Sequence, residues 1–257
     1  MILAFVFLAV VYMNGWLRLR SAQRVSASRA ASLLTGLFLV WGALESPLVA
    51  YDHHLLTVHM VQHLLLMTVA PPLILLGEPL AGFWHGSPRR AQVVLGRLLQ
   101  PPFVQRVGLI LSRPAWCWTV STLVLVAWHV PALLTMALES EVWHSVEQSS
   151  FLVAGLLFWW PVVQPWPTVS TGPQWSTLLY LFLATLPCDA LAGFLVFSDR
   201  VAYPVYFSMP RHFGLSVLED QQCAAALMWT CITLIYLVPA AILSTQMLSP
   251  RRLQSVN

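Results

Sequence analysis

The sequence predicts an all-α, polytopic membrane protein with seven transmembrane helices. Of its 257 residues, 58% are hydrophobic and only 9% are charged, whereas a soluble domain averages about 25% charged residues. The apolar residues form runs of about 20, which is the length that crosses a bilayer as a helix. Twelve tryptophans and six tyrosines suit a protein with an aromatic belt at each membrane surface.

Seven stretches have the length and composition of a spanning helix. They are residues 1–17, 30–50, 55–77, 114–138, 143–163, 174–197 and 221–247. The first is the shortest, and the third contains Pro71 and Pro72, which we expect to break or kink it. No internal repeat or soluble domain is evident. We therefore expect residues 1–257 to form a single transmembrane domain in the lipid bilayer.

The arginines predict the orientation of the chain. All 13 basic residues are arginines, and eleven of them fall on one side of the membrane. These are Arg18, Arg20, Arg24, Arg29, Arg89, Arg90, Arg97, Arg106, Arg113, Arg251 and Arg252. Because cytoplasmic loops are enriched in positive charge, we expect the N-terminus outside and the C-terminus in the cytoplasm. The basic loop at 78–113 is expected to lie along the cytoplasmic surface as amphipathic pieces.

The charge and the cysteines argue against two classes of function. The net charge of +3 comes from arginines in loops between apolar spans, which indicates topology and not a phosphate-binding surface. No nucleic-acid partner is therefore expected. The cysteines lie in or beside apolar spans and form neither a secreted disulfide pattern nor a CxxC site. They are Cys117, Cys188, Cys223 and Cys231.

Polar side chains from five spans are expected at one depth, near the outer surface. His59 and His63 are four residues apart, so they share one helix face. At 1.5 Å per residue, His63, His129 and Asp189 each lie roughly 12–14 Å below the outer ends of their helices. The other members of this layer are Glu45, His144, Glu147 and Asp220. Ionisable groups in lipid face the bundle interior and pair with something, so we expect one shared site.

This layer contains the donor types of a copper site. Imidazole suits copper, iron and zinc, whereas thioether and thiol select Cu(I). The sulfur donors near the layer are Met60, Met136, Met228, Cys188 and Cys223. For some residues an interpretation without metal binding stays open. Met60 and Met67 can equally be packing residues. Histidines near the membrane surface are typical of headgroup contacts, and these are His53, His54, His85 and His212.

Several motifs resemble one family when they are taken in order. They are SPL at 46–48, HMVQHLLLMTVAPPLILLGEP at 59–79, WHVP at 128–131, HSVEQSSF at 144–151, FWWPV at 158–162, YPVY at 203–206, LEDQQ at 218–222 and MW at 228–229. Together they resemble the multi-spanning bacterial cytochrome c oxidase assembly factors, the CtaG group. The sequence departs from that group at Gln148, where a second histidine is common, and at 223–225, where a glycine pair is common.

The resemblance implies a multi-pass protein of the bacterial plasma (inner) membrane that helps to assemble the copper-containing oxidase of the respiratory chain. Its implied partner is a cytochrome c oxidase subunit, in particular a copper-bearing catalytic one, and its implied cargo is copper as Cu(I). Members of the group are not regarded as enzymes, so no catalytic residue is expected. The depth of the polar layer and the family resemblance both predict a site at the outer face of the membrane.

The leading hypothesis is therefore a copper-binding assembly factor. His59, His63 and His129 would be the primary ligands. Met60 and His144 would be secondary ligands, or the ones that first receive the ion. Carboxylates commonly orient ligating imidazoles from outside the coordination sphere, and the candidates for this role are Glu147, Asp189 and Asp220.

Three alternatives remain. In the first, the polar layer binds no metal and acts as a scaffold that docks an oxidase subunit during assembly. In the second, His63 and His129 are axial ligands of a haem b in an electron-transfer protein. The third, a metallohydrolase, is disfavoured because the HMVQH segment lacks the glutamate of the HExxH motif.

Overall fold

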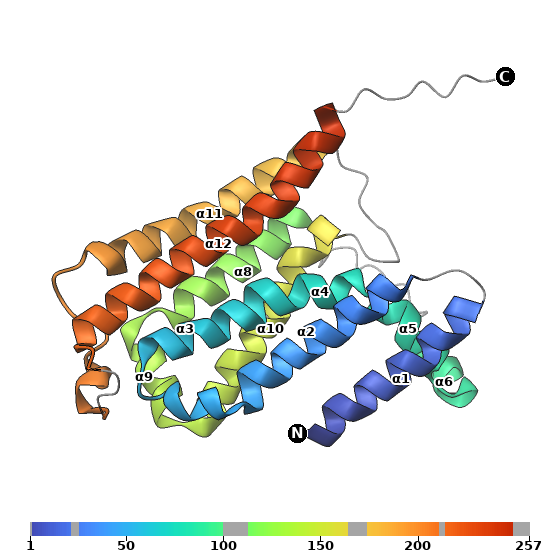
Figure 1. The fold of residues 1–257 in the computed structure, drawn as a ribbon, viewed down its shortest axis with the longest axis horizontal. Helices are drawn as coiled ribbons and strands as arrows, with labels where there is room; N and C mark the ends of the chain where they lie inside the picture. The colour runs from blue at the N-terminus through green and yellow to red at the C-terminus, as the bar shows by residue number, and fades with distance from the viewer. Residues whose placement is uncertain (1, 22–25, 100–112, 164–173, 211–213, 249–257) are drawn as a thin grey trace.

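The computed structural model describes residues 2–21, 26–99, 113–163, 174–210 and 214–248 (Figure 1). Its regular elements are all helical within these ranges, as predicted. Six helices are long and apolar enough to cross a membrane, and a bent pair makes a seventh span if it is counted as one. The spans are α1 Ile2–Ser21, α2 Ala27–Glu45, α3 Leu56–Leu64 with η2 Leu65–Val69 and α4 Ala70–Leu76, the pair α8 Pro114–Trp128 and α9 Pro131–Glu139, α10 Glu141–Val163, α11 Gln174–Phe197 and α12 Val217–Leu248.

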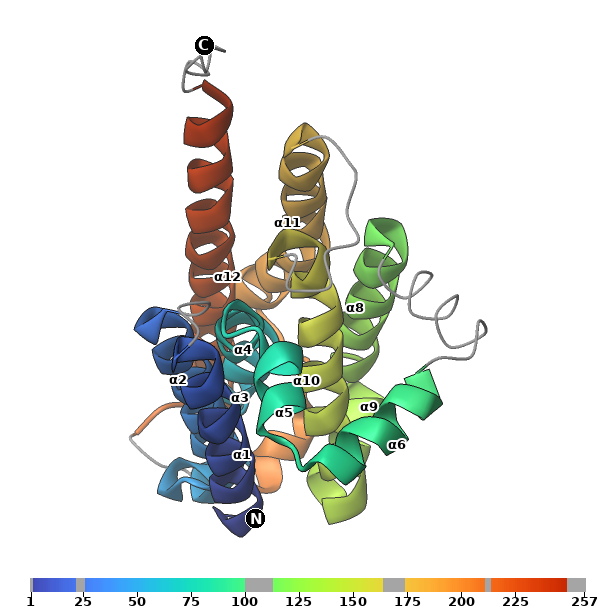
Figure 2. The same cartoon turned by 90° about the vertical axis from the view of Figure 1, so that its right-hand side faces the viewer.

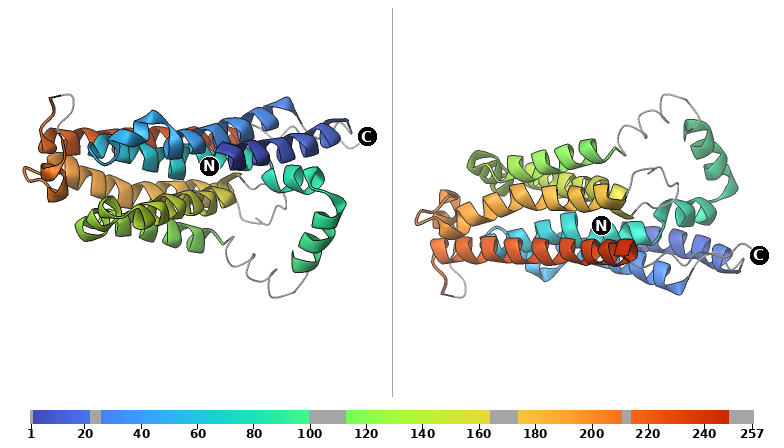
Figure 3. Two further views of the ribbon diagram at one scale, coloured as in Figure 1. Left: turned by 90° about the horizontal axis from the view of Figure 1, so that it is seen from below. Right: turned by 90° about the horizontal axis from the view of Figure 1, so that it is seen from above.

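Four shorter elements lie between these spans. They are the 3₁₀ turns η1 Pro47–Tyr51 and η3 Pro204–Ser208, and the helices α5 Pro79–Gly86 and α6 Arg89–Leu99. The last two occupy the predicted basic segment, and α6 lies across the direction of the long helices (Figure 3). The rest of that segment, 100–112, lies outside the described residues. Which end of the bundle faces outward remains a prediction from the arginines.

The third span is the centre of the bundle. In its most apolar stretch 61% of the residues are buried, against 39% or fewer in the other single-helix spans. It packs against α2, α10 and α12 (Figures 1 and 2). The two histidines of this span are therefore enclosed by three other helices.

The third span runs through its two prolines as a modified helix. Residues Leu65–Val69 form a π-helical turn that ends two residues before Pro71. Proline has no N–H to donate and crowds the carbonyl four residues earlier, and a wider π turn accommodates both effects. The expected break therefore becomes a local widening, one turn beyond His63.

Gly155 allows α10 to approach this widened turn closely. A Cβ atom built on Gly155 would lie 2.5 Å from the Met67 carbonyl oxygen and 2.7 Å from Pro71 Cγ. Only a residue without a side chain fits at that separation. Because Glu147 lies about two turns earlier on α10, this contact also sets the distance between Glu147 and the central span.

The fourth span is broken where the sequence predicted a continuous helix over 114–138. Helices α8 and α9 meet at an angle of 73°. Val130 is extended (φ −70°, ψ 125°) because it precedes Pro131, and a residue before proline is pushed out of the helical region. His129 closes α8 with φ −87° and ψ 0°. The depth expected for His129 assumed one straight helix, so it does not apply.

Gly155→Ala is expected to lower the free energy of unfolding by about 1–3 kcal/mol, because the added methyl group overpacks the contact with the π turn. The measurement is unfolding by SDS in mixed micelles. Gly193→Ala is the matched control, since a Cβ there meets no atom of the described residues within 4 Å. Equal stability of the two variants would contradict the close packing described above.

Candidate metal centre

Two histidines and one glutamate meet inside the bundle. His59 and His63 project from α3, and Glu147 projects from α10. The Nε2 atoms of both histidines lie 3.4 Å from Glu147 Oε1. The side chains of His59 and Glu147 are fully buried, and that of His63 is 6% exposed. We call these three residues the deep group.

The separations in the deep group fit a bound metal better than a hydrogen bond. A hydrogen bond from imidazole to carboxylate is about 2.7–3.2 Å long. Two ligands on one tetrahedral ion, with bonds of about 2.0–2.1 Å, lie about 3.3–3.4 Å apart. One ligand atom from each residue can be chosen so that all three lie within 4.8 Å of one another. The residues therefore fit the coordination of a late transition metal.

The polar atoms of the deep group are also unsatisfied. Both carboxylate oxygens of Glu147 and both ring nitrogens of His59 and His63 are buried without a hydrogen-bond partner among the described residues. An ionised carboxylate in such surroundings costs a large desolvation free energy unless a cation compensates it. The ring of Phe151 stacks on His63 at a centroid distance of 4.0 Å, which covers one side of the group with an apolar surface.

His129 approaches the deep group from the break between α8 and α9. Its ring centroid lies 6.3 Å from that of His63. Its Nδ1 lies 2.7 Å from the Leu125 carbonyl oxygen, so Nδ1 carries the proton and Nε2 keeps the lone pair that can bind a metal. Nε2 is buried and has no hydrogen-bond partner among the described residues. The His129 carbonyl accepts a bond of 3.1 Å from the Tyr203 hydroxyl.

His144 links the deep group to a second cluster. Its ring stacks on His59 with centroids 5.7 Å apart. Its Nε2 lies 3.6 Å from Asp52 Oδ2 and 3.1 Å from the Gln148 amide nitrogen. Asp52 Oδ1 in turn lies 3.5 Å from His53 Nε2. We call Asp52, His53 and His144 the shallow group, because the His53 side chain is 29% exposed.

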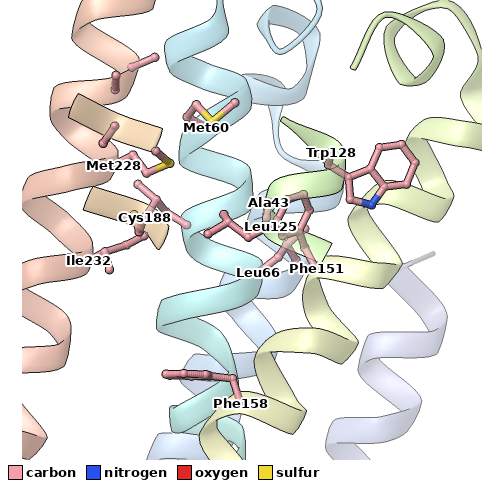
Figure 4. Packing of buried hydrophobic residues seen from close by; sticks show 14 of the residues in the cluster. Ala43, Met60, Leu66, Leu125, Trp128, Phe151, Phe158, Cys188, Met228 and Ile232 are labelled. Carbon is pink, nitrogen blue, oxygen red and sulfur yellow. The ribbon is translucent and has the colours of Figure 1, made fainter. Parts of the chain in front are cut away.

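Met60 lies outside the deep group but shares a cavity with one of its members, His63. It lines a cavity of about 20 Å³ together with Met67, Met228, His63 and His129. Figure 4 shows Met60 and Met228 projecting into the space between α3 and α12. Thioether sulfur therefore lies next to two of the candidate imidazoles without belonging to either carboxylate-containing group.

Three acidic residues of the expected layer, Glu45, Asp189 and Asp220, belong to neither group. The Asp220 carboxylate accepts bonds from the backbone N–H groups of Leu56 (2.8 Å) and Thr57 (3.1 Å) and from the Thr57 hydroxyl (2.6 Å). It therefore caps the first turn of α3, where backbone N–H groups have no helical acceptor. Asp189 is half-buried on α11, and its Oδ1 has no hydrogen-bond partner among the described residues.

Comparison with known proteins identifies the relatives of this chain. A family model described as cytochrome c oxidase caa3 assembly factor matches residues 10–249. The chain belongs to the caa3 oxidase assembly factor family. This confirms the resemblance seen in the motifs, and the family is one of assembly factors and not a known enzyme family. With its membrane-spanning helices, this family member is an integral membrane protein.

Two curated relatives of this caa3 assembly factor family member are proteins described as uncharacterised, from Mycobacterium bovis and Mycobacterium tuberculosis. Each is 25% identical over 254 residues. The matches cover 94% of this chain but only 37% of each relative, so the chain spans little more than a third of their length. No solved structure matches it.

The shallow group of this assembly factor was only partly visible in the sequence. His144 was a candidate ligand, but His53 was interpreted as a headgroup contact and Asp52 was not singled out. The available signal was an acidic residue followed by two histidines in the turn before His59. Sequence spacing does not reveal that this turn folds inward, which buries Asp52 completely.

Asp220→Ala is expected to destabilise the protein by about 1–3 kcal/mol, because it leaves the N–H groups of Leu56 and Thr57 without an acceptor. Asp220→Asn keeps one carbonyl acceptor and should lose less. Thermal unfolding in detergent measures both. Asp199→Ala, at an exposed position, is the control, and native stability of Asp220→Ala would show that the cap contributes nothing.

Proposed function

We propose that this protein binds copper through His59, His63 and Glu147 and passes it to a cytochrome c oxidase subunit during assembly. Glu147, first expected to orient imidazoles from outside, is proposed here as a ligand. The observation that carries the proposal is a set of buried nitrogen and oxygen atoms, with N···O separations of 3.4 Å, that have no hydrogen-bond partner within the ranges that the structure describes. The membership of an oxidase assembly family supports the identity of the recipient.

Copper is the metal that the donors favour. Nitrogen and oxygen donor sites bind Cu²⁺ more tightly than the other divalent first-row ions, and thioethers select Cu(I). The Met60, Met67 and Met228 side chains line a cavity next to His63 and His129. The cargo can therefore find imidazole and thioether donors within the same region, which suits a protein that handles Cu(I).

The deep group suits an ion that must be handed on. It offers three protein ligands, whereas closed structural sites usually supply four. An incomplete shell leaves one position for a donor of the recipient, so the ion can pass by ligand exchange. We propose that this occurs at the outer face of the bacterial plasma membrane, in keeping with the arginine distribution.

A haem b between His63 and His129 is disfavoured because the cavity there is too small for a porphyrin. The cavity that His63 and His129 line together measures about 20 Å³, which holds about one water molecule. A porphyrin would have to displace the side chains that line this cavity with them. The metal-free scaffold remains the competing hypothesis, and it predicts no bound copper.

The first test is copper content. The protein is purified in detergent under reducing conditions, loaded with Cu(I) and desalted, and copper is counted by elemental analysis. The native chain should retain copper, and His59→Ala/His63→Ala should lose the ion of the deep group. His85→Ala is the matched control, because His85 is exposed and lies on α5, away from the group. Native protein without copper would favour the scaffold.

Glu147→Gln separates a binding role from a structural one. The substitution removes a buried carboxylate that has no hydrogen-bond partner in the described part of the chain, so the metal-free protein should gain about 1–3 kcal/mol of stability. The same variant should bind copper at least tenfold more weakly, in line with the loss of a ligand. Thermal unfolding with and without Cu(I) measures both effects.

Glu139→Gln, at an exposed position on α9, should change neither property. If Glu147→Gln were instead destabilised in the metal-free state and bound copper as the native chain does, the carboxylate would be a structural group and the proposed ligand set would be wrong.

A further inference from the structure

The shallow group has the same composition as the deep group. Each contains two histidines and one carboxylate, and in each the three chosen ligand atoms lie within 4.8 Å of one another. Within the shallow group the nitrogen-to-oxygen separations are 3.5 Å for His53 and 3.6 Å for His144. These values are longer than a hydrogen bond and close to the spacing of two ligands on one ion.

The members of the shallow group are held in place by their own partners. Asp52 is fully buried, and its Oδ2 accepts a bond of 3.0 Å from the Gln62 amide. His53 Nδ1 lies 3.2 Å from the Leu138 carbonyl oxygen, so Nδ1 donates there and Nε2 is left facing Asp52. Partners that fix a ring nitrogen in this way are typical of metal-ligating histidines.

Of the four imidazoles, only that of His53 is substantially exposed. The exposed fraction of the side chain is 29% for His53, 6% for His144, 0% for His59 and 6% for His63. Ring-to-ring distances along this row are 4.9 Å from His53 to His144, 5.7 Å from His144 to His59 and 4.3 Å from His59 to His63. The four imidazoles therefore form a continuous row from the end of the bundle to its interior.

We propose that the shallow group is a second copper site, through which the ion reaches the deep group. This inference rests on the proposed copper function and adds the route of loading. Transfer would exchange donors of Asp52 and His53 for donors of the deep group, with His144 between them. No change of oxidation state is needed, because each group supplies one carboxylate and two neutral imidazoles. The similar donor sets make the exchange reversible.

The test compares His53→Ala with its neighbour His54→Ala. His54 lies in the same turn, is similarly half-buried, and belongs to neither group. Cu(I) is supplied as a complex with a coloured chelator, so the absorbance change gives the loading rate and elemental analysis gives copper per chain at saturation. His144 is not varied, because it also contacts His59.

The native chain and His54→Ala should each hold two copper ions, one for each group. His53→Ala should hold one and load at least tenfold more slowly. Asp52→Asn should behave like His53→Ala, and it keeps an oxygen for the Gln62 amide. His59→Ala/His63→Ala should hold one ion at the native loading rate, because the shallow group remains.

Three results would overturn the inference. If His53→Ala matched the native chain in both copper count and loading rate, the shallow group would not be a site, although the deep group would stand. If the native chain held a single ion, and only His59→Ala/His63→Ala lost it, the deep group would likewise be a copper site and the shallow group would not. A native chain that bound no copper would refute the proposed function together with this route.

Discussion

The Glu147 carboxylate is the buried charge around which the interior of the bundle is organised. It lies between two imidazoles of the central span, at a distance from each that is too long for a hydrogen bond. A membrane interior offers no water to offset such a charge, so the group is stable only if something positive joins it. The surrounding helices α2, α10 and α12 hold the carboxylate and the two imidazoles in this arrangement.

Three separate contacts fix the walls of this site. Asp220, on the last helix, caps the start of α3 and so sets the position of both of its histidines. Gly155 lets α10 rest against the π turn, which fixes the approach of Glu147. Gln221 binds the backbone of Ala202 in the loop before α12, next to the tyrosine that holds the His129 carbonyl. Motifs far apart in the sequence thus converge on one site as packing and capping groups, and only some of their residues belong to the deep group.

The sequence was sufficient to predict the helical membrane fold, because long apolar runs have few other solutions in lipid. It also predicted that His59 and His63 share a face, which follows from helical period alone. It did not predict the bend at His129. A proline in a spanning helix can either bend the helix axis or be accommodated by a wider helical turn, and the outcome depends on packing against neighbouring helices. Pro131 gave a bend of 73°, whereas Pro71 followed a π turn within a continuous span. The sequence also did not single out Asp52. The turn that contains Asp52 folds inward because of contacts with Gln62 and α9, and such contacts leave no periodic pattern in the sequence.

The bent pair also connects the deep group and the shallow group mechanically. Helix α9 begins beyond His129, which faces the deep group, and near its other end the Leu138 carbonyl holds the ring of His53 in the shallow group. The short helix therefore contacts one candidate ligand at each end, His129 at the break with α8 and His53 near Leu138. A rotation of α9 about the break would move both. A partner that pressed on α9 would disturb both groups at the same moment. In the proposed function, docking of the recipient and release of copper would then be a single movement.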